Sequence, residues 1–187
     1  MRNKTRLEEK YSSEVIKTLA AELAIKNSLA RPRIEKVVIN CGIGEIAKNK
    51  EQMEAAVIDL ARITGQKPQV RRARVSVASF AVRKGAPVGL RVTLRDERMY
   101  IFLDKLFSIV FPRLRDFRGL STASFDKFGN YTLGLTEQTI FPEVDITQAA
   151  KPFGLEVTIV TSVREPQVAR RLLELLGMPF TKEDQNG

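Results

Sequence analysis

The segment from Val88 to Arg95 alternates apolar and polar side chains in the pattern of a half-buried β-strand. Directly after it, apolar residues recur at helical spacing between Asp96, the predicted N-terminal cap, and Pro112, the predicted end; they are Met99, Phe102, Leu103, Leu106 and Val110. A strand and a helix that each have one apolar face must both bury that face. Packing the helix as a layer on the sheet buries both faces. This pairing favours an α+β fold.

The rest of the chain extends the same pattern. Helices are predicted over Leu7 to Leu23, from Asn49 to Gly65 with Asn49 and Gln52 as a capping box, and from Pro166 to Gly177. Strands are predicted over Arg33 to Ile43 and Glu156 to Ser162, with a hairpin around Lys127 to Gly129. We expect one domain over residues 1–180, with antiparallel pairing in most of its sheet, and a frayed tail over 181–187.

The positive charge of the chain is concentrated in one segment. Lys and Arg total 31 against 22 Asp and Glu, a net charge of +9. From Leu60 to Arg95 there is no acid, and the nine basic residues there equal the whole excess; they are Arg62, Lys67, Arg71, Arg72, Arg74, Arg83, Lys84, Arg91 and Arg95. A basic surface kept only for solubility would scatter its cations. This acid-free segment predicts a polyanionic partner.

Strand alternation then selects candidate contacts. Val37, Ile39 and Cys41 take one face of the first strand, and Lys36, Val38 and Asn40 take the other. If both strands belong to one sheet covered by helices on its apolar face, the exposed face carries Lys36, Asn40, Arg91, Thr93 and Arg95, which suit phosphate, sugar and base edges. The basic segment is interrupted by Pro68, Gly85, Pro87 and Gly89, which predicts a long connection or a flexible hairpin. We expect residues 71–84 to form a second cationic element there.

Other chemistries fit the sequence less well. Gly42-Ile43-Gly44 imitates a dinucleotide fingerprint, but Glu45 would repel phosphate and no ribose-binding acid follows at the required distance, so two turn glycines at a strand end are favoured. Glu137, Glu143 and Asp145 could bind a metal or act as acid and base, although a solvated loop fits better. Cys41 is expected to be buried and inert. We expect no cofactor and no metal.

Composition and the N-terminus bear on location. The chain has no histidine and one cysteine, which removes the commonest general base and excludes an internal disulfide. No run approaches the ~18 apolar residues of a membrane span, and the N-terminus lacks the apolar stretch of a secretory signal. We expect a cytoplasmic protein without a membrane partner.

Longer strings resemble a known family, the universal large-subunit ribosomal protein number five in its bacterial form. They include Pro32 to Asn40, Ile63 to Pro68, Val92 to Arg95, Pro112 to Leu120, Ser124 to Asp126, Gly129 to Tyr131, Ile140 to Glu143 and Leu176 to Phe180. The resemblance covers nearly the whole chain. It implies a non-enzymatic constituent of the large ribosomal subunit that attaches 5S rRNA in the central protuberance.

The resemblance also implies partners and site residues. Positions matching Asn40, Gln66, Thr93 and Arg95 face rRNA in this family, and Lys67 lies beside Gln66 in a matching string. The family contacts P-site tRNA through a loop matching about Arg74 to Val88; the candidate residues here are Arg74, Ser76, Ser79, Phe80, Arg83 and Lys84. The resemblance further implies an inter-subunit bridge with small-subunit ribosomal protein thirteen, and contacts with other central-protuberance proteins.

Two points stay open at the level of sequence. Family members commonly carry more charges than Arg74-Val75-Ser76 and Phe80-Ala81-Val82 in this loop, so the strength of the tRNA contact is undecided. The basic segment alone also fits a free-standing nucleic-acid-binding protein or RNA chaperone, and a nucleotide-dependent oxidoreductase would need cofactor binding at Gly42 to Ala47.

Overall fold

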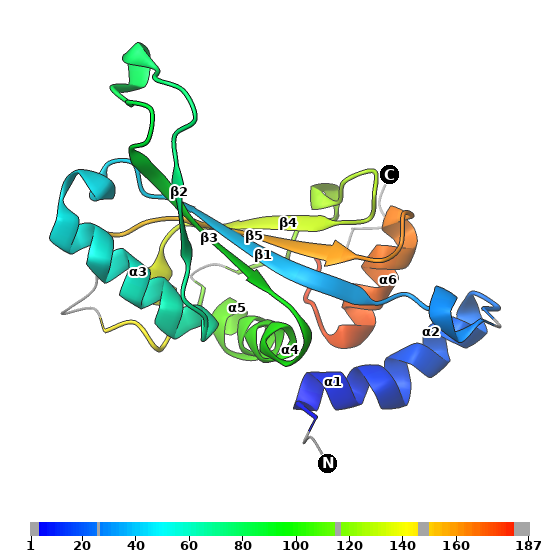
Figure 1. The fold of residues 1–187 in the computed structure, drawn as a ribbon. Coiled ribbons are helices and arrows are strands. Elements are labelled where there is room, and N and C mark those ends of the chain that lie inside the picture. Colours follow the sequence, from blue (N-terminus) through cyan, green and yellow to red (C-terminus); the bar gives the residue numbers. More distant parts are fainter. Residues whose placement is uncertain (1–3, 26, 115–116, 146–149, 182–187) are drawn as a thin grey trace. The chain divides into compact units, whose positions relative to one another are not determined.

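The computed structural model describes residues 4–25, 27–114, 117–145 and 150–181. Five strands form one antiparallel sheet in the order β2-β3-β1-β5-β4, shown in Figure 1; they are β1 (Ile34–Gly42), β2 (Gln69–Arg72), β3 (Pro87–Leu94), β4 (Tyr131–Leu135) and β5 (Leu155–Thr161). Together with the helices this confirms the predicted α+β class. Within the described residues, no helix has the length and apolar character to cross a membrane.

Residue contacts divide the chain into two compact units. The first comprises residues 1–37, 95–132 and 158–187, and the second comprises 38–94 and 133–157. Strands β1, β4 and β5 continue from one unit into the other. The single domain expected over residues 1–180 stays a prediction, and residues 182–187 of the expected tail lie outside the described part of the chain.

Helix α3 (Lys50–Thr64) of the second unit begins and ends where the sequence predicts. The Asn49 side chain accepts hydrogen bonds from the backbone N–H of Glu51 at 2.9 Å and of Gln52 at 3.4 Å. Gly65 ends the helix with φ of 65°, a left-handed conformation that glycine adopts without a steric penalty. The helix buries Ala56, Leu60 and Ile63 and contacts β3, whose residues Leu90, Val92 and Leu94 are also buried.

A network of hydrogen bonds joins residues 150–153 to the rest of the second unit. Gln138 is fully buried; its Nε2 donates to the carbonyl of Ala150 at 3.2 Å, and its Oε1 accepts from Phe153 N at 2.9 Å. Ala150 N in turn donates to the buried carboxylate of Asp59 on α3 at 3.0 Å. The side chain of Gln52 does not form the predicted capping box. Its Oε1 instead accepts a hydrogen bond from Lys151 N at 2.9 Å.

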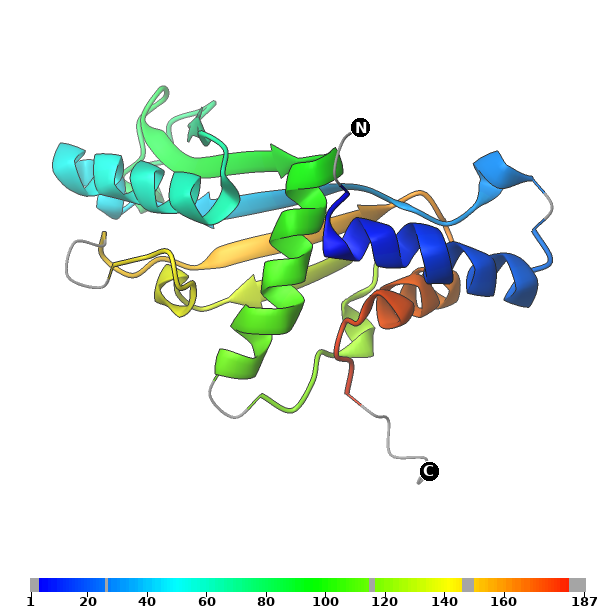
Figure 2. The same ribbon diagram turned by 90° about the horizontal axis from the view of Figure 1, so that it is seen from below.

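The first unit is mainly helical. A continuous helical stretch consists of α1 (Arg6–Lys10), a π-helical turn η1 (Tyr11–Val15) and α2 (Ile16–Glu22), and it buries Leu7, Val15 and Leu19. A second stretch comprises α4 (Asp96–Lys105), the π-helical turn η5 (Leu106–Val110) and α5 (Phe111–Arg113). Helix α6 (Pro166–Leu176) ends at Gly177 as predicted. Figure 2 shows α1 against α4, and η1 also contacts α6.

Two predicted boundaries of the α4 stretch are wrong. Arg95, not Asp96, occupies the cap position; Asp96 is the first helical residue and has φ of 50°, so its side chain does not cap the helix. Pro112 does not stop the helix, because the wide turn η5 precedes it and the helix continues to Arg113. Proline is tolerated there because Pro112 lies in the first turn of α5, directly after the π-helical turn, where its missing N–H is not needed.

The hairpin predicted around Lys127 to Gly129 is present only as a turn closed by a single bridge. Phe125 and Tyr131 form an antiparallel bridge across it, and the carboxylate of Asp126 accepts hydrogen bonds from the N–H of Phe128 at 2.9 Å and of Asn130 at 2.8 Å. Gly129 has φ of 74°. Tyr131 then begins β4, which pairs with β5 rather than extending a hairpin ladder.

Candidate nucleic-acid interface

Strands β2 and β3 form a polar strand face in the second unit. In their antiparallel register Gln69 lies opposite Arg91 and Arg71 lies opposite Gly89, and opposite residues point to the same side. Because Leu90 and Val92 point toward the buried side, the polar strand face consists of Gln69, Arg71, Arg91 and Thr93. Arg71 and Arg91 are exposed, while Thr93 is half-buried.

In the part of the chain that the structure describes, the two arginines of this face have no acidic partner. Arg71 donates to the side-chain oxygen of Gln69 at 3.3 Å, a neutral contact, and neither Arg71 nor Arg91 forms an ion pair with any described residue. An unpaired guanidinium on an exposed strand keeps its donors available for a phosphate or a base edge. The polar strand face is therefore an electropositive surface that polyanions can approach.

Asn40 lies on β1, the strand next to β3 in the sheet. It is half-buried between the buried Ile39 and Cys41, and strand alternation turns its amide to the side away from them. Cys41 is buried as expected, and burial raises the pKa of its thiol to about 12. Val38, on the same side as Asn40 by alternation, is also buried, so this strand is less clearly two-sided than its sequence indicates.

Gln66 is brought beside Thr93 by the turn after α3. The hydroxyl of Thr64 lies 2.7 Å from the carbonyl oxygen of Leu60, and it accepts from Gln66 N at 3.3 Å. With Gly65 left-handed, the side chain of Gln66 folds toward β3, and its Nε2 donates to the carbonyl oxygen of Thr93 at 3.3 Å. The exposed Lys67 follows directly. Two residues far apart in sequence, Gln66 and Thr93, are thus neighbours.

Residues 73–86, here called the basic hairpin extension, carry the β2–β3 hairpin beyond its strands (Figure 1). Ala73 N donates to the carbonyl of Ala86 at 2.9 Å, and Val77 and Val82 exchange two further hydrogen bonds of 2.9 and 3.1 Å. Ser76 Oγ accepts from Lys84 N at 2.9 Å. The connection is therefore a hairpin, held by cross-strand bonds along its length.

The six candidate residues of the basic hairpin extension are all exposed: Arg74, Ser76, Ser79, Phe80, Arg83 and Lys84. Phe80 is 78% exposed near the tip, where the short 3₁₀ turn η4 (Ala78–Phe80) ends at Ala81 with φ of 51°. Because this hairpin carries cations and no acid of its own, the exposed ring can stack on a nucleobase while the cations meet phosphates.

The structure brings together only part of the predicted site. Asn40, Gln66, Lys67, Arg91 and Thr93 belong to the second unit, where Gln66 and Thr93 are in contact. Lys36, half-buried on β1, and Arg95, exposed at the start of α4, belong to the first unit. Sequence reasoning missed Gln69 and placed Arg71 in the loop rather than on the sheet; the alternation of Gln69-Val70-Arg71 after Pro68 was the available signal.

The chemistries disfavoured by the sequence find little support in the structure. After Gly44 the chain forms a short 3₁₀ turn, η3 (Ile46–Lys48), and α3 begins only after Asn49, so no helix N-terminus faces the glycines as in a dinucleotide site. Glu137, Glu143 and Asp145 are exposed, as the solvated-loop interpretation requires. Across the described ranges, no three or more His, Cys, Asp or Glu side chains gather as a metal site would need.

Comparison with known proteins places this geometry in a family. Residues 27–83 match the model described as ribosomal protein L5, and residues 87–180 match the model of the C-terminus of the same ribosomal family. Proteins named large ribosomal subunit protein uL5 are similar to this chain over nearly its whole length. The one from Thermoanaerobacter sp. (strain X514) is 53% identical over 178 residues, covering 95% of this chain and 99% of its own length. The one from Chloroflexus aurantiacus (strain ATCC 29366) is 54% identical over 175 residues, covering 94% and 97%. The chain belongs to the ribosomal protein L5 family.

Proposed function

We propose that this chain is a structural, non-catalytic constituent of the large ribosomal subunit and binds 5S rRNA through the polar strand face together with Asn40, Gln66 and Lys67. The observation that carries the proposal is that Arg71 and Arg91, on an exposed face beside the Gln66–Thr93 contact, form no ion pair with a described residue. Cations there neutralise phosphates, while the amides and the hydroxyl bond ribose 2′-hydroxyls and base edges.

Family membership supports the identity of the RNA partner, and the charge distribution supports the position of the interface. The relatives are named as large-subunit proteins, which fits a chain whose net charge of +9 equals the excess of its acid-free segment. On this proposal the protein works in the cytoplasm within the ribosome. Lys36 and Arg95, which belong to the first unit, would make RNA contacts of their own.

The basic hairpin extension has a separate proposed role. It contacts P-site tRNA through Phe80 and its cations, and the remaining surface meets small-subunit ribosomal protein thirteen and other proteins of the central protuberance, as the family resemblance implies. Its support is the exposed, acid-free surface of residues 74–85, carried on a hydrogen-bonded stem. The two sites can be removed independently because the stem closes at the Ala73–Ala86 bond.

A filter-binding titration of 5S rRNA at several salt concentrations tests the first role. Arg91→Ala should weaken binding and lower the slope of log affinity against log salt by about 0.7 to 0.9, because one phosphate contact is lost. Arg62→Ala is the matched control: Arg62 is an exposed arginine in the last turn of α3, without an ion pair to any described residue, in the same unit but off the polar strand face. Equal slopes for both variants would reject the assigned interface.

Replacing residues 74–85 by Asn-Gly tests the second role. Asn-Gly favours the two-residue turn that closes hairpins, so the Ala73–Ala86 bond and the strands below it should be retained. We expect normal 5S rRNA binding and reduced retention of P-site tRNA on reconstituted ribosomes. Equal loss of both would contradict the separation of roles. A free-standing RNA chaperone would be favoured if the unmodified protein left large subunits during a high-salt wash.

A further inference from the structure

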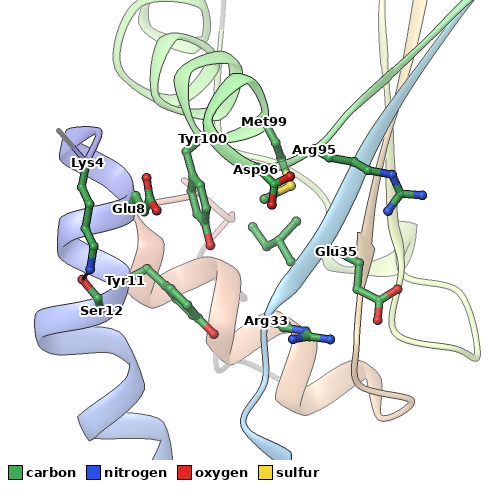
Figure 3. Close-up of a pocket in the computed structure, with 11 residues that line it drawn as sticks. Lys4, Glu8, Tyr11, Ser12, Arg33, Glu35, Arg95, Asp96, Met99 and Tyr100 are labelled. Atoms are coloured by element: carbon green, nitrogen blue, oxygen red, sulfur yellow. Dashed lines mark hydrogen bonds between the residues drawn. The ribbon is translucent and has the colours of Figure 1, made fainter. Parts of the chain in front are cut away.

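A pocket of about 590 Å³ lies in the first unit, outside the interface proposed above except for one shared residue, Arg95. Figure 3 shows that α1 and η1 form one wall, the start of β1 another, and the start of α4 the third. This volume falls in the range of about 300 to 1,000 Å³ typical of sites for small molecules. The size alone permits a ligand of one nucleotide.

Tyr100 supplies an unused hydrogen-bonding group in this pocket. Only 8% of the residue is exposed, and its ring packs against Tyr11 with centroids 6.2 Å apart and ring planes inclined by 32°. The Tyr11 hydroxyl donates to the carbonyl oxygen of Pro32 at 2.9 Å, but the Tyr100 hydroxyl has no hydrogen-bond partner among the described residues. In Figure 3 that hydroxyl points into the pocket.

Within the described residues the Tyr100 hydroxyl is not a buried atom: it keeps contact with solvent at the pocket, although the rest of the side chain is nearly buried. Burial raises the pKa of Tyr100, with the Tyr11 hydroxyl, Glu8 and Asp96 adding to the effect, so the phenol stays protonated at neutral pH and can donate. The hydroxyl is therefore a donor open to the pocket, where an acceptor of a ligand can take the place of water.

The charges around the pocket restrict what that ligand can be. Arg33 and Arg95 are exposed and form no ion pair with a described residue, so both guanidinium groups can receive a phosphate. The carboxylates of Glu35 and Asp96 also line the pocket and suit amino groups rather than phosphates. A ligand that carries a phosphate, a flat ring and exocyclic amino groups meets all of these groups.

We propose that the pocket receives one nucleotide extruded from the bound RNA, its base against Tyr11 and Tyr100 and its phosphate at Arg33 and Arg95. Unstacked bases are commonly held by aromatic side chains and by hydrogen bonds to their edges. The near balance of acids and cations here differs from the acid-free segment and fits recognition of a base better than attraction of a duplex backbone. This inference rests on the proposed RNA-binding function.

Two tyrosine-to-phenylalanine variants separate the proposed role from a structural one. Tyr100→Phe removes the hydroxyl without a protein partner, so thermal stability should be unchanged while affinity for 5S rRNA falls about fivefold, the worth of one typical hydrogen bond. Tyr131→Phe is the matched control, because that hydroxyl donates to the carbonyl of Ser121 at 2.9 Å within the same unit. It should lower stability and leave affinity unchanged.

Ultraviolet crosslinking of the full chain to 5S rRNA identifies the ligand. We expect a single nucleotide joined to a peptide containing Tyr11 or Tyr100, and a salt slope that is unchanged in Tyr100→Phe, since no phosphate contact is lost. Absence of that crosslink, normal affinity of Tyr100→Phe, or an affinity loss matched by lost stability would each overturn the pocket assignment while the proposed function stands. Failure of the unmodified protein to bind 5S rRNA would overturn both.

Discussion

Thr64→Val changes one buried hydroxyl that holds the turn leading to Gln66. Thr64 is 5% exposed, its hydroxyl lies 2.7 Å from the carbonyl oxygen of Leu60, and it accepts from Gln66 N at 3.3 Å. Valine has nearly the same shape but leaves the Gln66 N–H without this acceptor. The substitution also removes the buried hydrogen bond with the Leu60 carbonyl; a typical hydrogen bond contributes about 0.5 to 1.5 kcal/mol, so for the two contacts we expect a loss of roughly 1 to 2 kcal/mol after the gain from the added methyl.

For a chain of this length each kcal/mol lowers Tm by about 2 to 4 °C, so Thr64→Val should melt roughly 2 to 8 °C lower. Because Gln66 is positioned through this turn, its bond to Thr93 should weaken and affinity for 5S rRNA should fall as well. Thermal melting followed by circular dichroism and filter binding of 5S rRNA measure the two effects.

Thr64→Ser is the matched control. Serine keeps the hydroxyl and loses a buried methyl group, at a cost of about 0.8 kcal/mol. Its stability should fall to a similar degree, but its RNA affinity should stay near that of the unmodified protein. Equal RNA affinities of the serine and valine variants would refute the claim that Thr64 positions Gln66, whatever their stabilities.

Three further predictions concern local structure. Gly65→Ala should cost about 1 to 2 kcal/mol in urea denaturation because φ there is 65°, whereas Gly42→Ala, with ordinary φ and open space around the added carbon, should be nearly neutral; equal costs would contradict the conformational argument. Asn49→Ala should cost about 1 kcal/mol through the lost helix cap, and an unchanged urea midpoint would contradict that role. Burial raises the pKa of the Cys41 thiol to about 12, so the thiol stays protonated at pH 8. It should react with a disulfide reagent at that pH only after denaturant is added. Rapid labelling of the native protein would contradict its burial.

Local signals predicted the elements that depend on neighbouring residues. Asn49 and Gly65 bound α3, and Gly177 ends α6, because caps act within a few residues of chain. The predicted boundaries of the α4 stretch were wrong because local residue preferences did not decide them. Asp96 is held at positive φ, and a π turn precedes Pro112, and neither feature follows from residue preferences alone.

The candidate site was predicted only where strand alternation was sufficient. Arg91 and Thr93 were placed correctly on the exposed side of β3 because alternation along a strand is a local property. The contact of Gln66 with Thr93 depends on a turn whose geometry the pattern does not specify. The pairing of Tyr11 with Tyr100 joins two helices distant in sequence, and no periodicity within either helix indicates it.

The central claim is that the polar strand face of β2 and β3, with Asn40 and Gln66, is the surface that binds 5S rRNA. Crosslinking in intact large subunits, mapped both to nucleotide and to residue, tests it most directly. We predict crosslinks from 5S rRNA to peptides containing Asn40, Gln66 or Arg91. Crosslinks from 5S rRNA confined to the outer side of α3 around Arg62, with none on the polar strand face, would contradict it.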